Sequence, residues 1–176
     1  GNSIQGKPVS IFGDKPVYSK EEWALVARGF NEMGRLAREK DMIFTVHHHM
    51  GTGVQTEEEI DRLMELTDPN LVYLLYDTGH LAFSGEDALR VLRKYAKRVK
   101  HVHLKSVRND VVAKAKAGGY SFLDAVRAGA FTVPGDGDFD FQPVFDILAE
   151  NGYEGWVVVE AEQDPAKANP FEYAVM

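Results

Sequence analysis

Four short apolar segments, each followed by polar side chains, constrain the fold of this chain more than any other feature. They span residues 42–46, 71–76, 99–104 and 155–160, and helical patterns separate them along the chain. The first, second and fourth are almost continuously apolar, which is typical of parallel strands that are covered on both faces. Strands that alternate with helices predict an α/β fold built on a parallel sheet.

Capping signals mark the start of two of the intervening helices. Ser19 with Glu22, and Thr56 with Glu59, form capping boxes that predict a helix over about 19–40 and a second one from residue 56. Further helices are expected over about 86–98, 121–128 and 141–151, with a loop over 7–18. A doubly wound sheet and part of a (β/α)₈ barrel both fit this order. Because no G-x-G-x-x-G motif follows the first strand, a dinucleotide-binding sheet loses its main support.

Charge and composition narrow the class of ligand. The 176 residues include 27 Asp and Glu against 20 Lys and Arg, a net charge of −7, without a Lys/Arg cluster longer than a helical turn. Nucleic acids and anionic membranes are therefore not expected as partners. Cysteine is absent, which excludes thiolate sites, and no apolar run approaches the ~20 residues of a membrane helix. We expect a cytoplasmic protein that binds a small molecule.

All six histidines fall between positions 47 and 103, at or just past the ends of predicted strands. The carboxyl ends of parallel strands form the active site in barrels and open sheets alike, so these side chains are expected to converge. Imidazole and carboxylate donors without thiolate suit Mn²⁺, Co²⁺, Fe²⁺ or Zn²⁺. Taking one donor from each strand predicts a metal site formed by His47, Asp77, His103 and Glu160.

Several neighbouring residues allow two interpretations. His101 lies two residues before His103 and either coordinates the metal or orients a ligand. Lys105 and Arg108 either hold a substrate oxygen or stabilise an enolate, or they are simply solvated. Residues 135–138 form a tight turn, with a place in the pocket lining as the alternative.

Beyond these single motifs, the chain resembles the xylose-isomerase-like (β/α)₈ superfamily and, within it, the inosose dehydratase family. The likeness extends over essentially all 176 residues, and it is carried by stretches 1–6, 47–54, 59–64, 74–80, 121–126, 131–137, 152–156 and 159–165. It implies the C-terminal half, about strands five to eight, of a TIM barrel. Residues 1–176 would then form a single partial domain that lacks the N-terminal strands and the end of the last helix.

The resemblance also implies one divalent ion held by a residue from each of strands five to eight. The matching positions are the four metal ligands already predicted, and Mn²⁺ or Co²⁺ is expected there, with Zn²⁺ or Fe²⁺ as alternatives. Two positions depart from the family pattern: His47 stands where many relatives carry Glu, and Ser106 stands where dehydratases of this type carry Asp.

The implied reaction is the loss of water from 2-keto-myo-inositol (scyllo-inosose), a cyclic polyol ketone, to give a trihydroxycyclohexane-dione. Glu160 or His49 is expected to act as base, His80 as acid or substrate anchor, and Lys105 as a stabilising cation. A sugar isomerase or epimerase of the same superfamily is one alternative. Another is a half-barrel that self-associates without turnover, since four strands leave open sheet edges; a homo-oligomer is expected on the same ground.

Overall fold

The computed structural model describes residues 3–13 and 15–175; residues 1, 2, 14 and 176, including the start of stretch 1–6, lie outside this description. The elements in chain order are α1 (Lys20–Arg38), β1 (Phe44–His47), α2 (Glu57–Leu66), β2 (Val72–Asp77), α3 (Thr78–Ser84), α4 (Ala88–Tyr95), β3 (Val99–Leu104), β4 (Ser106–Val107), α5 (Asn109–Ala117), α6 (Phe122–Arg127), β5 (Phe131–Thr132), α7 (Gln142–Glu150), β6 (Trp156–Val159) and α8 (Pro170–Tyr173).

The predicted strands form one parallel sheet. Its order is β1-β2-β3-β6, and every neighbouring pair is parallel, as predicted. The four strands of this sheet lie side by side in the order in which they occur along the chain. This is the arrangement of a barrel segment and not of a doubly wound sheet. A separate antiparallel pair, β4 with β5, was not predicted, because two-residue strands are too short to show a periodic pattern.

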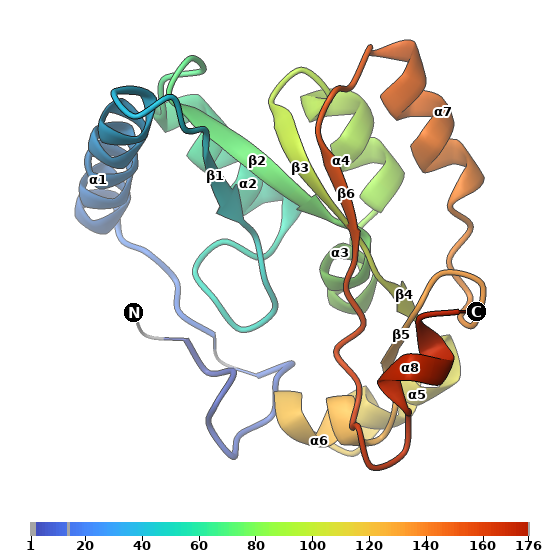
Figure 1. Cartoon of the computed structure of the whole chain (residues 1–176). Helices are drawn as coiled ribbons and strands as arrows, with labels where there is room; N and C mark the ends of the chain where they lie inside the picture. The colour runs from blue at the N-terminus through green and yellow to red at the C-terminus, as the bar shows by residue number, and fades with distance from the viewer. Residues whose placement is uncertain (1–2, 14, 176) are drawn as a thin grey trace.

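One face of the sheet packs against the helices, because alternate strand residues point to opposite faces. In β2 the residues Val72, Leu74 and Tyr76 are fully buried, whereas Tyr73 and Leu75 between them are only partly buried. The buried set joins apolar residues of α1, α2, α4 and α7 in the main hydrophobic core. Figure 1 shows α2, α4 and α7 beside the sheet and α1 at its β1 edge.

The fourth strand is more exposed than its sequence indicates. Trp156 is 77% exposed and Val159 55% exposed, although an apolar run predicted coverage on both faces. β6 pairs with β3 alone among the described strands. The prediction that both faces of this strand are covered was therefore wrong.

Local signals account for most helix boundaries. Both capping boxes are present, with Ser19 and Thr56 as the N-caps of α1 and α2. The helix expected over 86–98 is observed as the shorter α4, which is capped by Asp87 and ends at Tyr95. Helix α3 was not predicted: Asp77, the last residue of β2, is also its N-cap, so strand and helix follow without a loop.

The end of the sheet toward which β1 points carries a second, smaller core. Helices α5, α6 and α8 and the β4–β5 pair gather there, together with the N-terminal loop (Figure 1). Its buried members include Ile4 and Ile11 from that loop, and Phe83, Phe122 and Phe131. This layer surrounds the carboxyl ends of the strands, where the predicted site residues lie. Among the described residues, no helix is long and apolar enough to cross a membrane.

Candidate metal centre and active site

Strand register brings the four predicted ligands together. Asp77 is paired with His103 across β2 and β3, and the Glu160 amide donates to the Leu104 carbonyl just past β6. His103 Nδ1 lies 3.1 Å from Glu160 Oε2 and 3.4 Å from Asp77 Oδ2. His47 Nε2 lies 3.3 Å from the same Asp77 oxygen. His47 and His103 thus both contact Asp77, and His103 also contacts Glu160, at the carboxyl end of the sheet.

Helix α3 adds a further imidazole to this cluster. The Asp77 carboxylate accepts the His80 amide at 2.9 Å as the helix cap, and this turn directs the His80 ring back toward the site. His47, Asp77, His80 and Glu160 each offer one donor atom, and these atoms all lie within 4.8 Å of one another, so His80 stands in this group where the sequence predicted His103. Two carboxylates and two imidazoles at this spacing are a donor set suited to a divalent cation.

Lys105 lies at the centre of the charged groups, directly after β3. Its ammonium is fully buried and lies 2.6 Å from Glu160, 2.7 Å from Glu162 and 3.4 Å from Asp77. It also lies 2.9 Å from His80 Nε2, to which the ammonium donates. The proton of neutral His80 is therefore on Nδ1, which is buried without a hydrogen-bond partner in the described chain.

A second group adjoins the first. His49, His80 and Glu162 offer donor atoms within 4.8 Å of one another, and the His49 and His80 rings lie 3.5 Å apart between centroids. His49 Nε2 is 3.8 Å from Glu162, while its Nδ1 contacts the Gln5 amide of the N-terminal loop. No role was predicted from the sequence for Glu162 or for Gln5, which is 44 positions from His49.

Aromatic rings form the apolar wall of this region. Phe122 of α6 lies 5.3 Å from the His49 ring, and Phe131 of β5 lies 5.5 Å from the His80 ring, between centroids. The Lys105 ammonium lies 5.3 Å from the centre of the Phe131 ring. Apolar surroundings of this kind lower the local dielectric and strengthen the charge interactions of the site.

The charged groups shift one another's pKa values. Burial alone would raise the pKa of Asp77, but hydrogen bonds from His103 and His47 and the charges nearby hold it well below its usual range. The hydrogen bond from His103 lowers the pKa of Glu160 to about 2, with Lys105 adding to the effect. Burial opposes charge on His103, yet Asp77 and Glu160 raise its pKa to about 9. The carboxylates are thus ionised and available as ligands at neutral pH.

Two further pKa shifts bear on proton transfer. Burial lowers the pKa of His80 well below its usual range, so its imidazole is neutral near pH 7. Burial also opposes the charge of Lys105, but Asp77, Glu162 and Glu160 outweigh it and raise its pKa. The site therefore combines a neutral imidazole with a permanent ammonium.

The remaining candidates lie at the edge of the site. Arg108 makes an ion pair with Asp136 at 2.5 Å and donates to the Gly129 carbonyl, so the turn over 135–138 holds Arg108. Ser106 is fully buried and its hydroxyl accepts the Phe139 amide at 3.3 Å. His101 is on the same sheet face as His103, 5.2 Å away between ring centroids.

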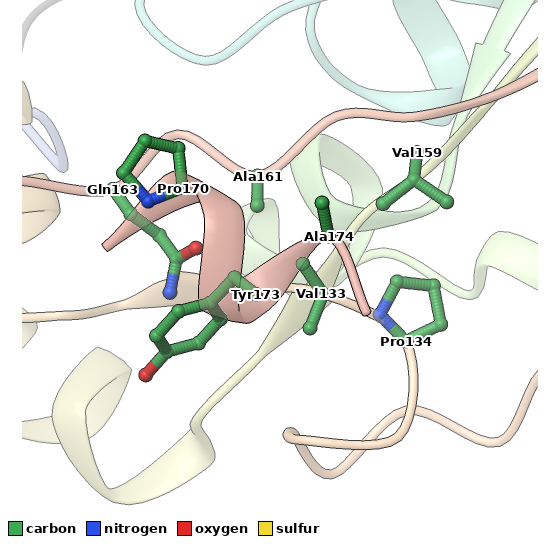
Figure 2. A pocket seen from close by; sticks show the side chains of 8 residues that line it. All are labelled: Val133, Pro134, Val159, Ala161, Gln163, Pro170, Tyr173 and Ala174. Carbon is green, nitrogen blue, oxygen red and sulfur yellow. The ribbon is translucent and has the colours of Figure 1, made fainter. Parts of the chain in front are cut away.

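A mainly apolar pocket of about 440 Å³ adjoins the end of β6 (Figure 2). Val159 and Ala161, which flank Glu160, contribute to its lining, and Tyr173 and Ala174 at the end of the described chain close it. Because alternate residues of an extended chain point to opposite sides, this pocket lies on the side of the chain away from the Glu160 carboxylate.

Comparisons with known proteins agree with the fold. Helices around a parallel sheet, with histidines and carboxylates at the strand ends, are the architecture of a TIM-barrel family. The family model for the xylose isomerase-like TIM barrel matches residues 5–174, and the chain belongs to this family.

Within it, the chain is similar to inosose dehydratases. It is 67% identical over 176 residues to the inosose dehydratase of Clostridium tetani and 63% identical to that of Geobacillus thermodenitrificans. In both cases the match covers 99% of this chain and 59% of the relative, so the chain spans about three fifths of the length of these relatives. Among solved structures, the zinc-bound IOLI protein matches 93% of this chain and 53% of its own at a TM-score of 0.64 and 17% identity, a likeness of fold.

Proposed function

We propose that this chain carries the cation site and acid–base residues of a hydro-lyase that removes water from 2-keto-myo-inositol, giving a trihydroxycyclohexane-dione. The observation that carries the proposal is the convergence of histidines and carboxylates from four strand ends in one charged cluster. High identity to proteins named inosose dehydratase supports the choice of reaction. The substrate is accordingly a cyclic polyol ketone.

The residues present fit a divalent cation. Asp77 and Glu160 are ionised, and His47 and His103 lie on the same face of the sheet within 3.4 Å of Asp77. We assign these four as the ligands, as the sequence predicted. His80 is the competing fourth donor, because its ring belongs to the group of donor atoms that lie within 4.8 Å of one another. Such a cation, Mn²⁺ or Co²⁺ in our proposal, would polarise the ketone and a neighbouring hydroxyl of the substrate.

The chain's own side chains would move the protons. In the reaction a C–H bond beside the ketone and the C–O bond of the β-hydroxyl both break, and the proton and hydroxide leave as water. His49 is the better placed base, because the Glu160 carboxylate already accepts from both His103 and Lys105. Neutral His80, whose Nδ1–H has no partner among the described residues, suits a substrate anchor better than an acid. The Lys105 ammonium would stabilise negative charge on the substrate oxygen.

Metal binding by the 176-residue chain tests the site directly. Titration with Mn²⁺ in a calorimeter should give a single site per chain, and Asp77→Ala should abolish it. Asp110→Asn, which removes an exposed carboxylate on α5, serves as control and should leave binding unchanged. Equal Mn²⁺ affinity in wild type and Asp77→Ala would contradict the ligand assignment.

Turnover tests the reaction. The protein should convert scyllo-inosose to the diketone, lose this activity to a chelator, and regain it with Mn²⁺ or Co²⁺ better than with Ca²⁺. Incubation with ketohexoses tests the sugar isomerase or epimerase alternative, which shares the enolisation step. Activity that a chelator does not affect would favour a metal-free mechanism.

We also propose that the four strands correspond to half of an eight-stranded barrel and that the chain self-associates. The support is the edge strand β6, which leaves Trp156 and Val159 exposed. Exposed apolar edge strands favour pairing with a second chain. Size measurement by sedimentation should give a dimer or larger species, and a stable monomer would contradict this proposal.

A further inference from the structure

His48 is the one member of the 47–49 run without a place in the charged cluster. Its side chain is fully buried, between His47, which faces Asp77, and His49, which contacts Glu162. Its Nε2 accepts the backbone N–H of Asp77 at 3.2 Å. Because this nitrogen is an acceptor, the proton of the neutral ring is on Nδ1, which has no partner among the described residues.

The sheet geometry gives this hydrogen bond a specific place. Backbone pairing between β1 and β2 ends at His47 with Leu75, whereas β2 continues for two more residues, to Asp77. On its other side, Asp77 is still paired with His103 of β3. The Asp77 amide therefore lies beyond the last residue of β2 that pairs with the β1 backbone. The His48 imidazole accepts this amide in place of a β1 carbonyl.

The Asp77 side chain is held at the same time. Its Oδ1 accepts the His80 amide at 2.9 Å, as the cap of α3. With the main-chain N–H bound to His48 and Oδ1 bound to α3, the second oxygen, Oδ2, is left facing His47 at 3.3 Å and His103 at 3.4 Å. The direction of Oδ2 thus depends on two hydrogen bonds that involve backbone amides, those of Asp77 and His80, and no charged side chain other than Asp77 itself.

We propose that His48 is a positioning residue for Asp77: its Nε2 fixes the Asp77 amide and so aims Oδ2 at the cation site. This inference rests on the proposed function, because it assigns Asp77 as a ligand. Partners that orient a ligand without touching the metal commonly change metal affinity about 10–100-fold when they are replaced. A loss of about tenfold in Mn²⁺ affinity is expected when the His48 acceptor is removed.

Three variants of the full 176-residue chain separate this role from a general effect on packing. His48→Leu fills the space without an acceptor, and His48→Gln places a carbonyl oxygen near the position of Nε2. Tyr76→Phe is the matched control, because it removes another buried hydrogen bond of β2, from the Tyr76 hydroxyl to the Ala88 carbonyl, on the opposite face of the sheet. Each variant is examined by amide hydrogen exchange, resolved by NMR, and by calorimetric titration with Mn²⁺.

His48→Leu should increase exchange at the Asp77 amide at least tenfold and weaken Mn²⁺ binding about tenfold. His48→Gln should restore the Asp77 exchange rate and the Mn²⁺ affinity to within about threefold of the wild type. Tyr76→Phe should change neither the exchange rate nor the affinity by more than about threefold. Retained Asp77 protection in His48→Leu, or failure of His48→Gln to restore it, would overturn the inference.

A measurement on the wild type keeps the test decisive if His48→Leu does not fold. A scalar coupling between the Asp77 amide nitrogen and His48 Nε2, transmitted through the hydrogen bond, should be detectable in ¹⁵N-labelled protein. Its absence would overturn the inference whatever the variants do. If the wild type binds no Mn²⁺, the proposed cation site fails, while the exchange and coupling measurements still decide whether His48 holds Asp77.

Discussion

Replacement of Lys105 by Met should destabilise the protein strongly. Met is close to Lys in length but lacks its charge, so the substitution removes the ammonium without opening a large cavity. The ammonium is fully buried, and three carboxylates converge on it at 2.6–3.4 Å. Removing one partner of a buried ion pair typically costs about 3–5 kcal/mol, because the remaining charge stays buried and uncompensated.

The exposure of the partners places the expected loss at the lower end of that range. Asp77 is fully buried, but the side chains of Glu162 and Glu160 are 27% and 39% exposed, so water screens part of their charge. A loss of about 3 kcal/mol corresponds to a urea midpoint lower by about 1–1.5 M, if the slope is about 2–3 kcal/mol per molar. Urea unfolding at pH 7, followed by circular dichroism, measures this.

The stability lost in Lys105→Met should also depend on pH, in a direction that the pKa values of its partners determine. Lys105 contributes to the lowered pKa values of Asp77, Glu160 and Glu162, so the stability that it provides is present in full above their ordinary values and is lost as pH falls. The difference between Lys105→Met and wild type should therefore be largest at neutral pH and shrink below about pH 4.5.

Lys114→Met is the matched control, because this exposed lysine on α5 pairs with a single exposed carboxylate. Its urea midpoint should equal that of the wild type. A Lys105→Met protein as stable as the wild type at pH 7 would refute the view that this ammonium is the main counter-charge of the site.

Three further outcomes are expected. Gly34→Ala should destabilise by about 1–3 kcal/mol in urea unfolding, because an added Cβ would lie 2.2 Å from the Leu71 carbonyl oxygen. Ser19→Ala should cost about 1 kcal/mol in the same assay through loss of the α1 cap. Without added metal, the stabilising effect of His103 should be complete below its ordinary pKa and lost as pH rises through about 9, provided Glu160 stays ionised; pH titrations of wild type and His103→Gln should converge above that value.

The strand ends could be predicted from the sequence because their signal is local. Each apolar run stops at a polar residue, and parallel strands align these ends, so His47, Asp77 and His103 were expected together. Both histidines lie within 3.4 Å of the Asp77 carboxylate. Whether they bind metal stays a prediction. The capping boxes at Ser19 and Thr56 are local signals of the same kind, and both were confirmed.

The rest of the site depends on contacts between distant segments. Gln5 reaches His49 because the N-terminal loop packs on the smaller core, which no periodicity in the sequence indicates. Arg108 was a candidate for substrate binding, yet its guanidinium pairs with Asp136 in a turn 28 residues away. Helix α3 was missed because Thr78 and Gly79 are weak helix formers, and only the Asp77 cap reveals its start.

The corner after β2 explains how the charged cluster can keep a defined geometry. His48 fixes the Asp77 amide from β1, while the Thr78 hydroxyl accepts the Lys105 amide at 2.9 Å and donates to the Lys105 carbonyl at 2.8 Å, fixing the corner to β3. These bonds involve backbone groups and neutral side chains, so they hold the backbone of Asp77 and Lys105 without any contribution from the charges. Lys105→Met should therefore reduce stability while the Asp77 amide stays protected from exchange in the folded state. His48→Leu should instead expose the Asp77 amide to exchange, while every charged group of the site remains.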